Sequence, residues 1–221
     1  MWVKICGIKD LETAAAVAER RPDAIGLNFY PKSPRCVAPE TAAEIVTLLP
    51  PTVEAVGVFV NHEIETVAAI CRDCRLGTAQ MHGDETPQQL AELRLTSPEL
   101  KIVRGHRMGG EGIEPLETYL TTCQQQGVEL TACLIDARVE GTYGGSGQVA
   151  PWSLLAEQYQ RRSWPPLILA GGLNPANVAG AIEAVAPWGV DVASGVESSP
   201  GQKDLQAVEW FIASARGRSS A

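Results

Sequence analysis

Two hydrophobic periods alternate along this chain. Apolar runs of four to seven residues are each followed by a longer stretch in which apolar residues recur at helical spacing. The runs that we expect to form strands cover residues 3–6, 24–29, 55–60, 78–82, 101–105, 130–136, 167–170 and 190–193. The helical stretches cover residues 11–21, 39–49, 63–74, 86–95, 115–126, 152–161, 175–185 and 205–216. The pattern therefore predicts eight strand-plus-helix units in succession.

Such alternation is typical of a parallel sheet with crossover helices. Residues 55–60 and 167–170 are continuously apolar, as expected for strands that are covered on both faces. Eight units with no spare element favour a closed (βα)8 TIM barrel of the α/β class, with an open doubly wound sheet as the alternative. We expect one catalytic domain over residues 1–216 and a flexible tail over residues 217–221. A chain of 221 residues could also form two small domains, but no interior linker is evident.

Composition and charge narrow the class of protein. The formal net charge of −8 gives nucleic-acid binding no electrostatic support. The six cysteines are scattered rather than spaced like a disulfide framework, which favours reduced thiols in a cytoplasm. No charged-then-apolar leader follows Met1, and no apolar run reaches the length of a membrane helix. We therefore expect a cytoplasmic protein with no membrane partner.

Three glycine-bearing loops lie in the last third of the chain. They contain Gly144–Gly145–Ser146–Gly147, Gly171–Gly172 and Ser194–Gly195, and the last two follow the seventh and eighth predicted strands. Glycine allows the backbone to approach a ligand closely and to turn its amides toward an anion. In barrels of this kind the loops after strands seven and eight often hold phosphate. The alternative is that these glycines only form tight turns.

Several segments, in order along nearly the whole chain, are similar to one enzyme family. They are residues 4–7, 29–35, 57–61, 80–84, 144–147, 169–175 and 192–197, reading KICG, FYPKSPR, GVFVN, QMHGD, GGSG, LAGGLNP and VASGVE. Together they resemble phosphoribosylanthranilate isomerase. Two departures from the family pattern are the fifth strand, beginning at Lys101, and Ala193, where the family commonly has serine.

The resemblance implies a TIM barrel of tryptophan biosynthesis with no metal or organic cofactor, working as a monomer or homodimer. The implied reaction is the Amadori rearrangement of a small phosphoribosyl substrate, N-(5-phosphoribosyl)anthranilate, to the aminodeoxyribulose phosphate. Carried over by motif, Cys6 is the general base and Asp136 the general acid. The same comparison makes Arg35 the partner of the anthranilate carboxylate. It also implies a phosphate site at Gly145, Ser146, Gly147, Gly171, Gly172, Ser194 and Gly195.

These residue types suit the implied chemistry. A protonated Asp136 can donate to the furanose oxygen, and a Cys6 thiolate can then remove the C2′ proton. The base needs a pKa near the working pH, below the free cysteine value of about 8.5, and the acid needs a raised pKa. The guanidinium fork of Arg35 can bind both oxygens of a carboxylate. Without the motif, a lone cysteine at a strand end is more typical of a small buried apolar residue.

Other polar residues are weaker candidates. His82 closes the fourth strand and could contact the ligand, whereas His62 and His106 are expected to be structural. We expect Asp84 and Glu85 to assist the start of the next helix, Asp191 and Glu197 to support the late loops, and Asp204 to stabilise the last helix. Cys71 and Cys74 form a CxxC late in a helix with no second pair, so zinc or redox chemistry is not expected there.

Two alternatives to this function stay open. The isomerase of the histidine pathway performs the same chemistry on another phosphoribosyl substrate, but it typically carries an aspartate where this chain has Cys6. A dual-substrate enzyme is harder to separate from either. The second alternative is a non-catalytic barrel that binds a sugar phosphate as a sensor or scaffold. The presence of Cys6, Asp136 and Arg35 together argues against it.

Overall fold

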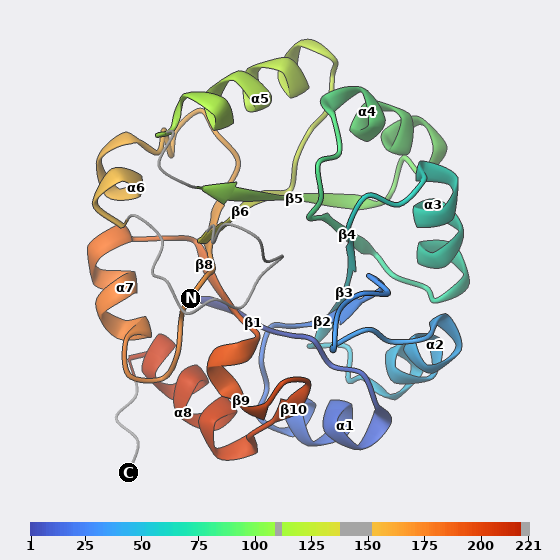
Figure 1. Cartoon of the computed structure of the whole chain (residues 1–221), viewed down its shortest axis with the longest axis vertical. Coiled ribbons are helices and arrows are strands. Elements are labelled where there is room, and N and C mark those ends of the chain that lie inside the picture. Colours follow the sequence, from blue (N-terminus) through green and yellow to red (C-terminus); the bar gives the residue numbers. More distant parts are fainter. Residues whose placement is uncertain (109–111, 138–151, 218–221) are drawn as a thin grey trace.

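Eight parallel strands close into a barrel at the centre of the molecule (Figure 1). The computed structural model describes residues 1–108, 112–137 and 152–217. The strands are β1 (Trp2–Cys6), β2 (Ala24–Asn28), β3 (Glu54–Phe59), β4 (Thr78–Met81), β5 (Lys101–Met108), β6 (Ala132–Ala137), β7 (Leu167–Leu169) and β8 (Gly189–Val192). Because β1 pairs in parallel with both β2 and β8, the sheet closes, and the alternative of an open sheet is wrong.

A ring of helices covers the outside of the barrel (Figure 1). These are α1 (Leu11–Glu19), α2 (Pro39–Leu48), α3 (Ile64–Asp73), α4 (Pro87–Thr96), α5 (Glu114–Gln125), α6 (Trp152–Gln158), α7 (Val178–Val185) and α8 (Leu205–Ala215). The predicted (βα)8 fold is confirmed, with all eight units in the expected order. The division into a domain of residues 1–216 and a tail stays a prediction.

Local side-chain chemistry explains where several helices begin. Asp10 accepts a hydrogen bond from the amide of Thr13 at the start of α1, and Asp204 accepts from the first amides of α8. Thr86 and Gln89 form a capping box at the start of α4. The last helix therefore begins as predicted.

Several boundaries differ from the prediction by one to three residues, and two of them have a clear local cause. The fifth strand continues to Met108 because it pairs with β6 along its whole outer half. Helix α7 begins at Val178, three residues later than expected. The side chain of Asn174 accepts hydrogen bonds from the amides of Ala176 and Asn177, so it closes a turn before the helix instead of capping the helix itself.

The apolar core has two layers. The larger cluster lies between the strands and the helices and includes Val3, Ile5, Phe59, Leu90 and Phe211. A smaller cluster inside the barrel contains Val103, Ala132, Leu134, Ile168 and Ala170, with Trp2 packed against it. Since side chains alternate between the two faces of a strand, the inward positions of the barrel strands share this interior with the polar residues described below.

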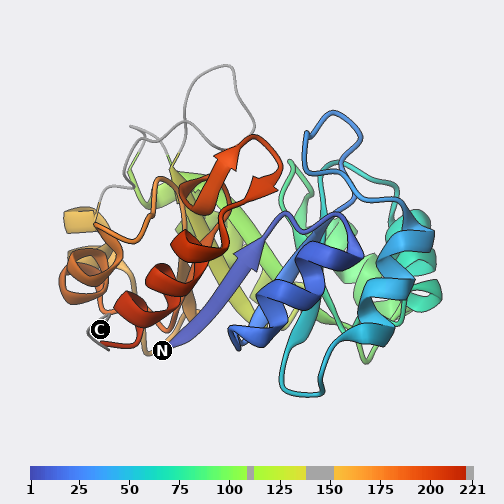
Figure 2. The same ribbon diagram turned by 90° about the horizontal axis from the view of Figure 1, so that it is seen from below.

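A short segment after β8 was not predicted. A 3-10 turn, η1 (Ser194–Val196), leads into a two-stranded hairpin of β9 (Glu197–Ser199) and β10 (Gln202–Lys203). Figure 2 shows this hairpin at the upper edge of the barrel, toward which the arrow of β1 points. Its strands are two and three residues long, too short for hydrophobic periodicity to reveal. In the described parts of the chain no helix is long and apolar enough to cross a membrane.

Candidate active site

Cys6 and Asp136 lie at the carboxyl-terminal ends of β1 and β6, and both are buried. The period-two alternation places Cys6 on the same face of β1 as Lys4, and Asp136 on the same face of β6 as Ala132 and Leu134. The latter two belong to the barrel interior. Both functional side chains therefore point into the barrel at one rim, where the carboxyl ends of all parallel strands lie.

The neighbouring strand makes room for the thiol of Cys6. A Cβ atom on Gly26 of β2 would lie 2.6 Å from Cys6 Sγ, so a larger residue at this position would collide with it. Burial raises the pKa of the Cys6 thiol, the charge of Lys4 lowers it, Asp191 raises it and Lys203 lowers it, and the net pKa is above the ordinary value. The chemical requirement of a base pKa below the free value is therefore not met by the described residues alone.

A buried ion pair lies next to Cys6 in the barrel interior, one period of the β1 alternation toward the amino end of the strand. Lys4 Nζ lies 2.8 Å from Asp191 Oδ1, and the two side chains are 1% and 9% exposed. The pair joins β1 to β8, where Lys4 and Asp191 are register partners. Asp191 thus has a specific partner, instead of only the supporting role in the late loops that we expected.

Arg35 is held by a carboxylate of the protein itself. Its Nε and Nη2 donate to the two oxygens of Glu197 at 2.8 and 2.7 Å. Glu197 also accepts from Lys203 Nζ at 2.7 Å, and Lys203 donates to the carbonyl oxygen of Ala193. The unexpected hairpin of β9 and β10 supplies two members of this network. Two nitrogens of the predicted carboxylate-binding residue are therefore occupied by Glu197.

On the other side of the rim, His82 lies beside Asp136. Their Nε2 and Oδ2 atoms are 3.5 Å apart. The other ring nitrogen of His82, Nδ1, is 2.9 Å from Gln80 Nε2, and this contact orients the imidazole. A Cβ atom on Gly105 of β5 would collide with His82 Nδ1, so this glycine leaves the space in which the ring sits. The structure thus brings His82 into the predicted site.

Glu85 does not have the predicted role at the start of α4. Its side chain is fully buried and lies 2.9 Å from Arg104 Nη1. Glu85 also accepts from the amides of Asn61 and Gly83, and Arg104 donates to the carbonyl oxygens of Met81 and Gly83. The helix is capped by Thr86 instead. The pair therefore fixes the loop that carries His82.

Part of the predicted phosphate site can be described. Gly171 and Gly172 follow β7 in consecutive left-handed conformations, with φ of 82° and 68°, which favour glycine. Ser194 and Gly195 lie in η1, and a Cβ atom on Gly195 would collide with the carbonyl oxygen of Leu173. The loops after β7 and β8 therefore meet at this rim. Gly145, Ser146 and Gly147 lie outside the described residues.

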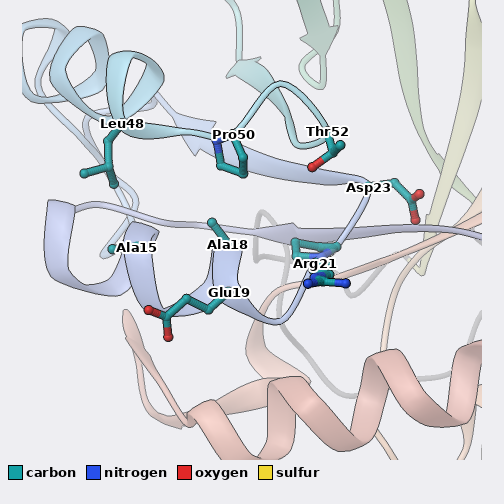
Figure 3. Close-up of a pocket in the computed structure, with 9 residues that line it drawn as sticks. Ala15, Ala18, Glu19, Arg21, Asp23, Leu48, Pro50 and Thr52 are labelled. Carbon is teal, nitrogen blue, oxygen red and sulfur yellow. The ribbon is translucent and has the colours of Figure 1, made fainter.

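Two cavities lie at the opposite end of the barrel from Cys6 and Asp136. One of about 830 Å³ lies between the carboxyl ends of α1 and α2, beside Arg21, Asp23 and Thr52 (Figure 3). A smaller one of about 290 Å³ is lined by Trp2, Lys4 and Gln80, among others. Neither contains a predicted catalytic residue. Among the described residues no group of three or more His, Cys, Asp or Glu side chains could hold a metal ion.

Known proteins provide an independent comparison. The family model of N-(5'phosphoribosyl)anthranilate (PRA) isomerase matches residues 3–214 of the chain. A curated N-(5'-phosphoribosyl)anthranilate isomerase from Trichlorobacter lovleyi is 42% identical over 215 residues, which are 97% of each chain.

Solved structures agree with this match. Phosphoribosyl anthranilate isomerase from Thermotoga maritima has a TM-score of 0.84 and 36% identity, covering 97% of this chain and 98% of the other. A structure of monomers of the dimeric enzyme from that organism has a TM-score of 0.80, 35% identity and the same coverage. A third, described in complex with reduced 1-(o-carboxyphenylamino)-1-deoxyribulose 5-phosphate, has a TM-score of 0.81, 35% identity and again the same coverage. The chain belongs to the N-(5'-phosphoribosyl)anthranilate isomerase family.

Proposed function

We propose that Cys6 and Asp136 catalyse the isomerisation of N-(5-phosphoribosyl)anthranilate to 1-(2-carboxyphenylamino)-1-deoxy-D-ribulose 5-phosphate by general base and general acid catalysis. Membership of the family makes the chain an isomerase of tryptophan biosynthesis, interconverting an aldose and a ketose. The observation that carries the assignment of roles is that a thiol and a carboxylate close two parallel strands at one rim of a closed barrel. Beside them lie a carboxylate-binding arginine and two converging glycine loops.

Asp136 acts first in this proposal. Its protonated form donates to the furanose ring oxygen, and the ring opens to a Schiff base. His82, 3.5 Å from Asp136 Oδ2, is placed to hydrogen-bond the carboxylate that this donation leaves behind. Gln80 keeps the imidazole in that position. His82 is therefore a contact of the acid, in addition to its predicted place beside the substrate.

Cys6 then removes the C2′ proton, and the resulting enolamine tautomerises to the ketone. Since burial outweighs the neighbouring cations and raises the pKa of Cys6, the thiolate is a minor form at neutral pH. The thiolate that does form is a stronger base, because basicity increases with pKa. The rate should therefore increase with pH until the thiol has titrated. No step in this sequence requires a metal or an organic cofactor.

The two anionic ends of the substrate need separate sites. Arg35 binds the anthranilate carboxylate, either through its remaining nitrogen or by exchanging Glu197 for the substrate. The phosphate is held by the backbone around Gly171, Gly172, Ser194 and Gly195, together with Gly145, Ser146 and Gly147 of the earlier loop. Gly171 and Gly172 have positive φ angles that favour glycine, and the missing side chains let a phosphate approach this backbone closely.

Family membership favours this function over the histidine-pathway isomerase and over a non-catalytic sugar-phosphate barrel. Whether the enzyme also accepts a second phosphoribosyl substrate is tested by the assay described next. A cytoplasmic location, the absence of a nucleic-acid partner and the choice between monomer and homodimer stay predictions.

The assay follows the loss of substrate fluorescence when the purified chain meets N-(5-phosphoribosyl)anthranilate. We expect saturable turnover, with no added metal. The phosphoribosyl substrate of the histidine pathway serves as the comparison, and we expect little or no turnover with it. Turnover of the histidine-pathway substrate alone would contradict the proposal, and equal turnover of both would replace it with a dual-substrate enzyme.

A further inference from the structure

Lys4 is a buried cation that the acid–base mechanism does not use. It lies two residues before Cys6 on β1, so both side chains lie on the inner face of that strand. Only 1% of the Lys4 side chain is exposed, and it is among the largest fully buried side chains of the described residues. A buried ammonium group is costly unless its charge is balanced and its N–H groups are bonded, so its position calls for a reason.

Asp191 balances the charge of Lys4 only in part. The two charged atoms are 2.8 Å apart, but neither has a well-aligned hydrogen bond to any described residue. An ammonium group has three N–H donors, and one carboxylate contact leaves donors available for a further acceptor. Burial lowers the pKa of Lys4, whereas Asp191 and Cys6 raise it more, so Lys4 keeps its proton. The cation is thus permanent at neutral pH.

The thiol of Cys6 is in position to be that further acceptor. Lys4 and Cys6 interact electrostatically, and each changes the pKa of the other. Other charges also face Cys6: Asp191 from β8, Lys203 from β10 and Arg35 from the loop after β2. Glu197 holds both Lys203 and Arg35 at 2.7–2.8 Å. Lys4 differs from these two cations, because its contact with Asp191 leaves ammonium donors that no other described residue takes up with good alignment.

We propose that Lys4 is a positioning residue for the base: its ammonium group stabilises the negative charge of the Cys6 thiolate, while Asp191 holds that ammonium group in place and moderates its effect. The proposal rests on the function proposed for Cys6. It makes the two members of one ion pair act in opposite directions on the thiol, because a positive charge favours the thiolate and a negative charge disfavours it. If the pair only stabilised the fold, replacing Lys4 and replacing Asp191 would not shift the titration of the thiol in opposite directions.

The test compares Lys4→Met with Asp191→Asn by two measurements. One is kcat/KM against pH. The other is the rate at which iodoacetamide alkylates Cys6, followed against pH by mass spectrometry of the peptide that contains it. In Lys4→Met both curves should move to higher pH by about one unit, which is about a tenfold smaller thiolate fraction at neutral pH. In Asp191→Asn both should move to lower pH.

Three further variants complete the design. Lys101→Met is the matched control, because Lys101 also pairs with a carboxylate, Glu54 at 3.2 Å, but its side chain is 57% exposed. It should leave both curves unchanged. Lys4→Arg should keep the wild-type curves, since the cavity of about 290 Å³ beside Lys4 gives room for the longer side chain. The double variant Lys4→Met with Asp191→Asn leaves neither charge unpaired, and its curves should lie at higher pH than those of Asp191→Asn.

Two results would overturn the proposal. One is a shift in the same direction for Lys4→Met and Asp191→Asn, which would indicate a common disturbance of the site. The other is an unchanged alkylation curve in Lys4→Met or, if that variant does not fold, a double variant whose curve matches that of Asp191→Asn. Alkylation reports on the thiol whether or not the thiol is catalytic. Normal turnover in Cys6→Ala would therefore end the base assignment, while the effect of Lys4 on the thiol would still be measured by alkylation.

Discussion

The two sides of the barrel rim hold their functional side chains differently. We call the side around Cys6 the β1–β8 sector; it contains Lys4, Asp191, Arg35, Glu197 and Lys203. The side around Asp136 is the β4–β6 sector; it contains Gln80, His82, Glu85 and Arg104. In the β1–β8 sector the cations outnumber the carboxylates that pair with them by one. In the β4–β6 sector the buried pair of Glu85 and Arg104 is balanced.

This difference matches the charge that each catalytic group must carry to react. A thiol becomes a useful base only as an anion, and the excess of positive charge around Cys6 offsets part of the rise in pKa that burial causes. Asp136 must hold a proton before it donates, and the contact that the structure shows for it is with an imidazole that can carry or release a proton. The balanced ion pair nearby fixes the loop without adding net charge to the acid.

Replacing either catalytic residue is expected to have the largest effect, and Asp136 is the one in the β4–β6 sector. Asp136→Asn keeps the size of the side chain but removes its transferable proton, and we expect kcat/KM to fall by about 10²–10⁴-fold, the usual contribution of a positioned acid. The loss of substrate fluorescence measures it. Far-UV circular dichroism of the variant confirms that the barrel has folded. Near wild-type turnover in a folded Asp136→Asn protein would assign the acid to another residue.

The next effect concerns stability in the β4–β6 sector. Arg104→Met leaves the Glu85 carboxylate buried without its cation, and we expect the free energy of unfolding to fall by about 3–5 kcal/mol. Urea denaturation measures it. The control is Arg72→Met, because the pair of Arg72 and Asp73 is largely exposed and its loss should change the stability by about 0.5 kcal/mol or less. Equal decreases in the free energy of unfolding of the two variants would show that the contribution of an ion pair does not depend on its burial.

The same two sectors show how far the sequence alone could be interpreted. The alternation of hydrophobic periods predicted all eight strand–helix units, because each strand end and helix face leaves a local signal. The roles of Cys6 and Asp136 came from the family resemblance, because a lone cysteine at the end of an apolar strand is by itself more typical of a small buried apolar residue. Glu85 was assigned to a helix start because it directly precedes one, and its partner Arg104 lies 19 residues further on.

Residues that act across strands leave no such local signal. Gly26 and Gly105 are ordinary glycines in the sequence, but one makes room for Cys6 and the other for His82 on the adjacent strand. Lys4 was a charged residue in an otherwise apolar run, and its pairing with Asp191 depends on the closure of the first strand onto the last. Arg35 was predicted to bind substrate, and only the hairpin after β8 revealed Glu197 as its partner.

A smaller effect on stability is expected in the β1–β8 sector. Glu197→Gln weakens the hydrogen bonds to Arg35 and Lys203, and we expect a loss of about 2–3 kcal/mol at pH 7. Burial raises the pKa of Glu197, but these two cations lower it more, so the folded carboxyl titrates below its unfolded value of about 4.3.

The pH dependence of that loss follows from the direction of the shift. A depressed pKa contributes stability above the unfolded value, and this contribution disappears as the pH falls through the folded value. The difference in unfolding free energy between wild type and Glu197→Gln should therefore be full at neutral pH and shrink below about pH 4.3. A difference that stays constant from pH 7 to pH 3 would rule out the carboxylate as its source.

The smallest effect is expected for substrate binding by Arg35. Arg35→Met should raise KM about tenfold and change kcat less, since a charge-assisted contact to the substrate carboxylate is lost while the base and acid remain. Arg35→Lys keeps the positive charge but not the forked guanidinium group. Its KM should lie between those of the wild type and Arg35→Met. The steady-state fluorescence assay gives both constants. An unchanged KM would mean that Arg35 serves only to hold Glu197.

The Cys6→Ala variant tests whether the thiol of Cys6 is the base. The measurement is single-turnover conversion of N-(5-phosphoribosyl)anthranilate by a Cys6→Ala protein whose circular dichroism matches that of the wild type. With the C2′ proton no longer removed by a thiolate, the rate should fall by about 10²–10⁴-fold while the substrate still binds. A folded Cys6→Ala protein that turns over substrate at the wild-type rate would show that Cys6 is not the base.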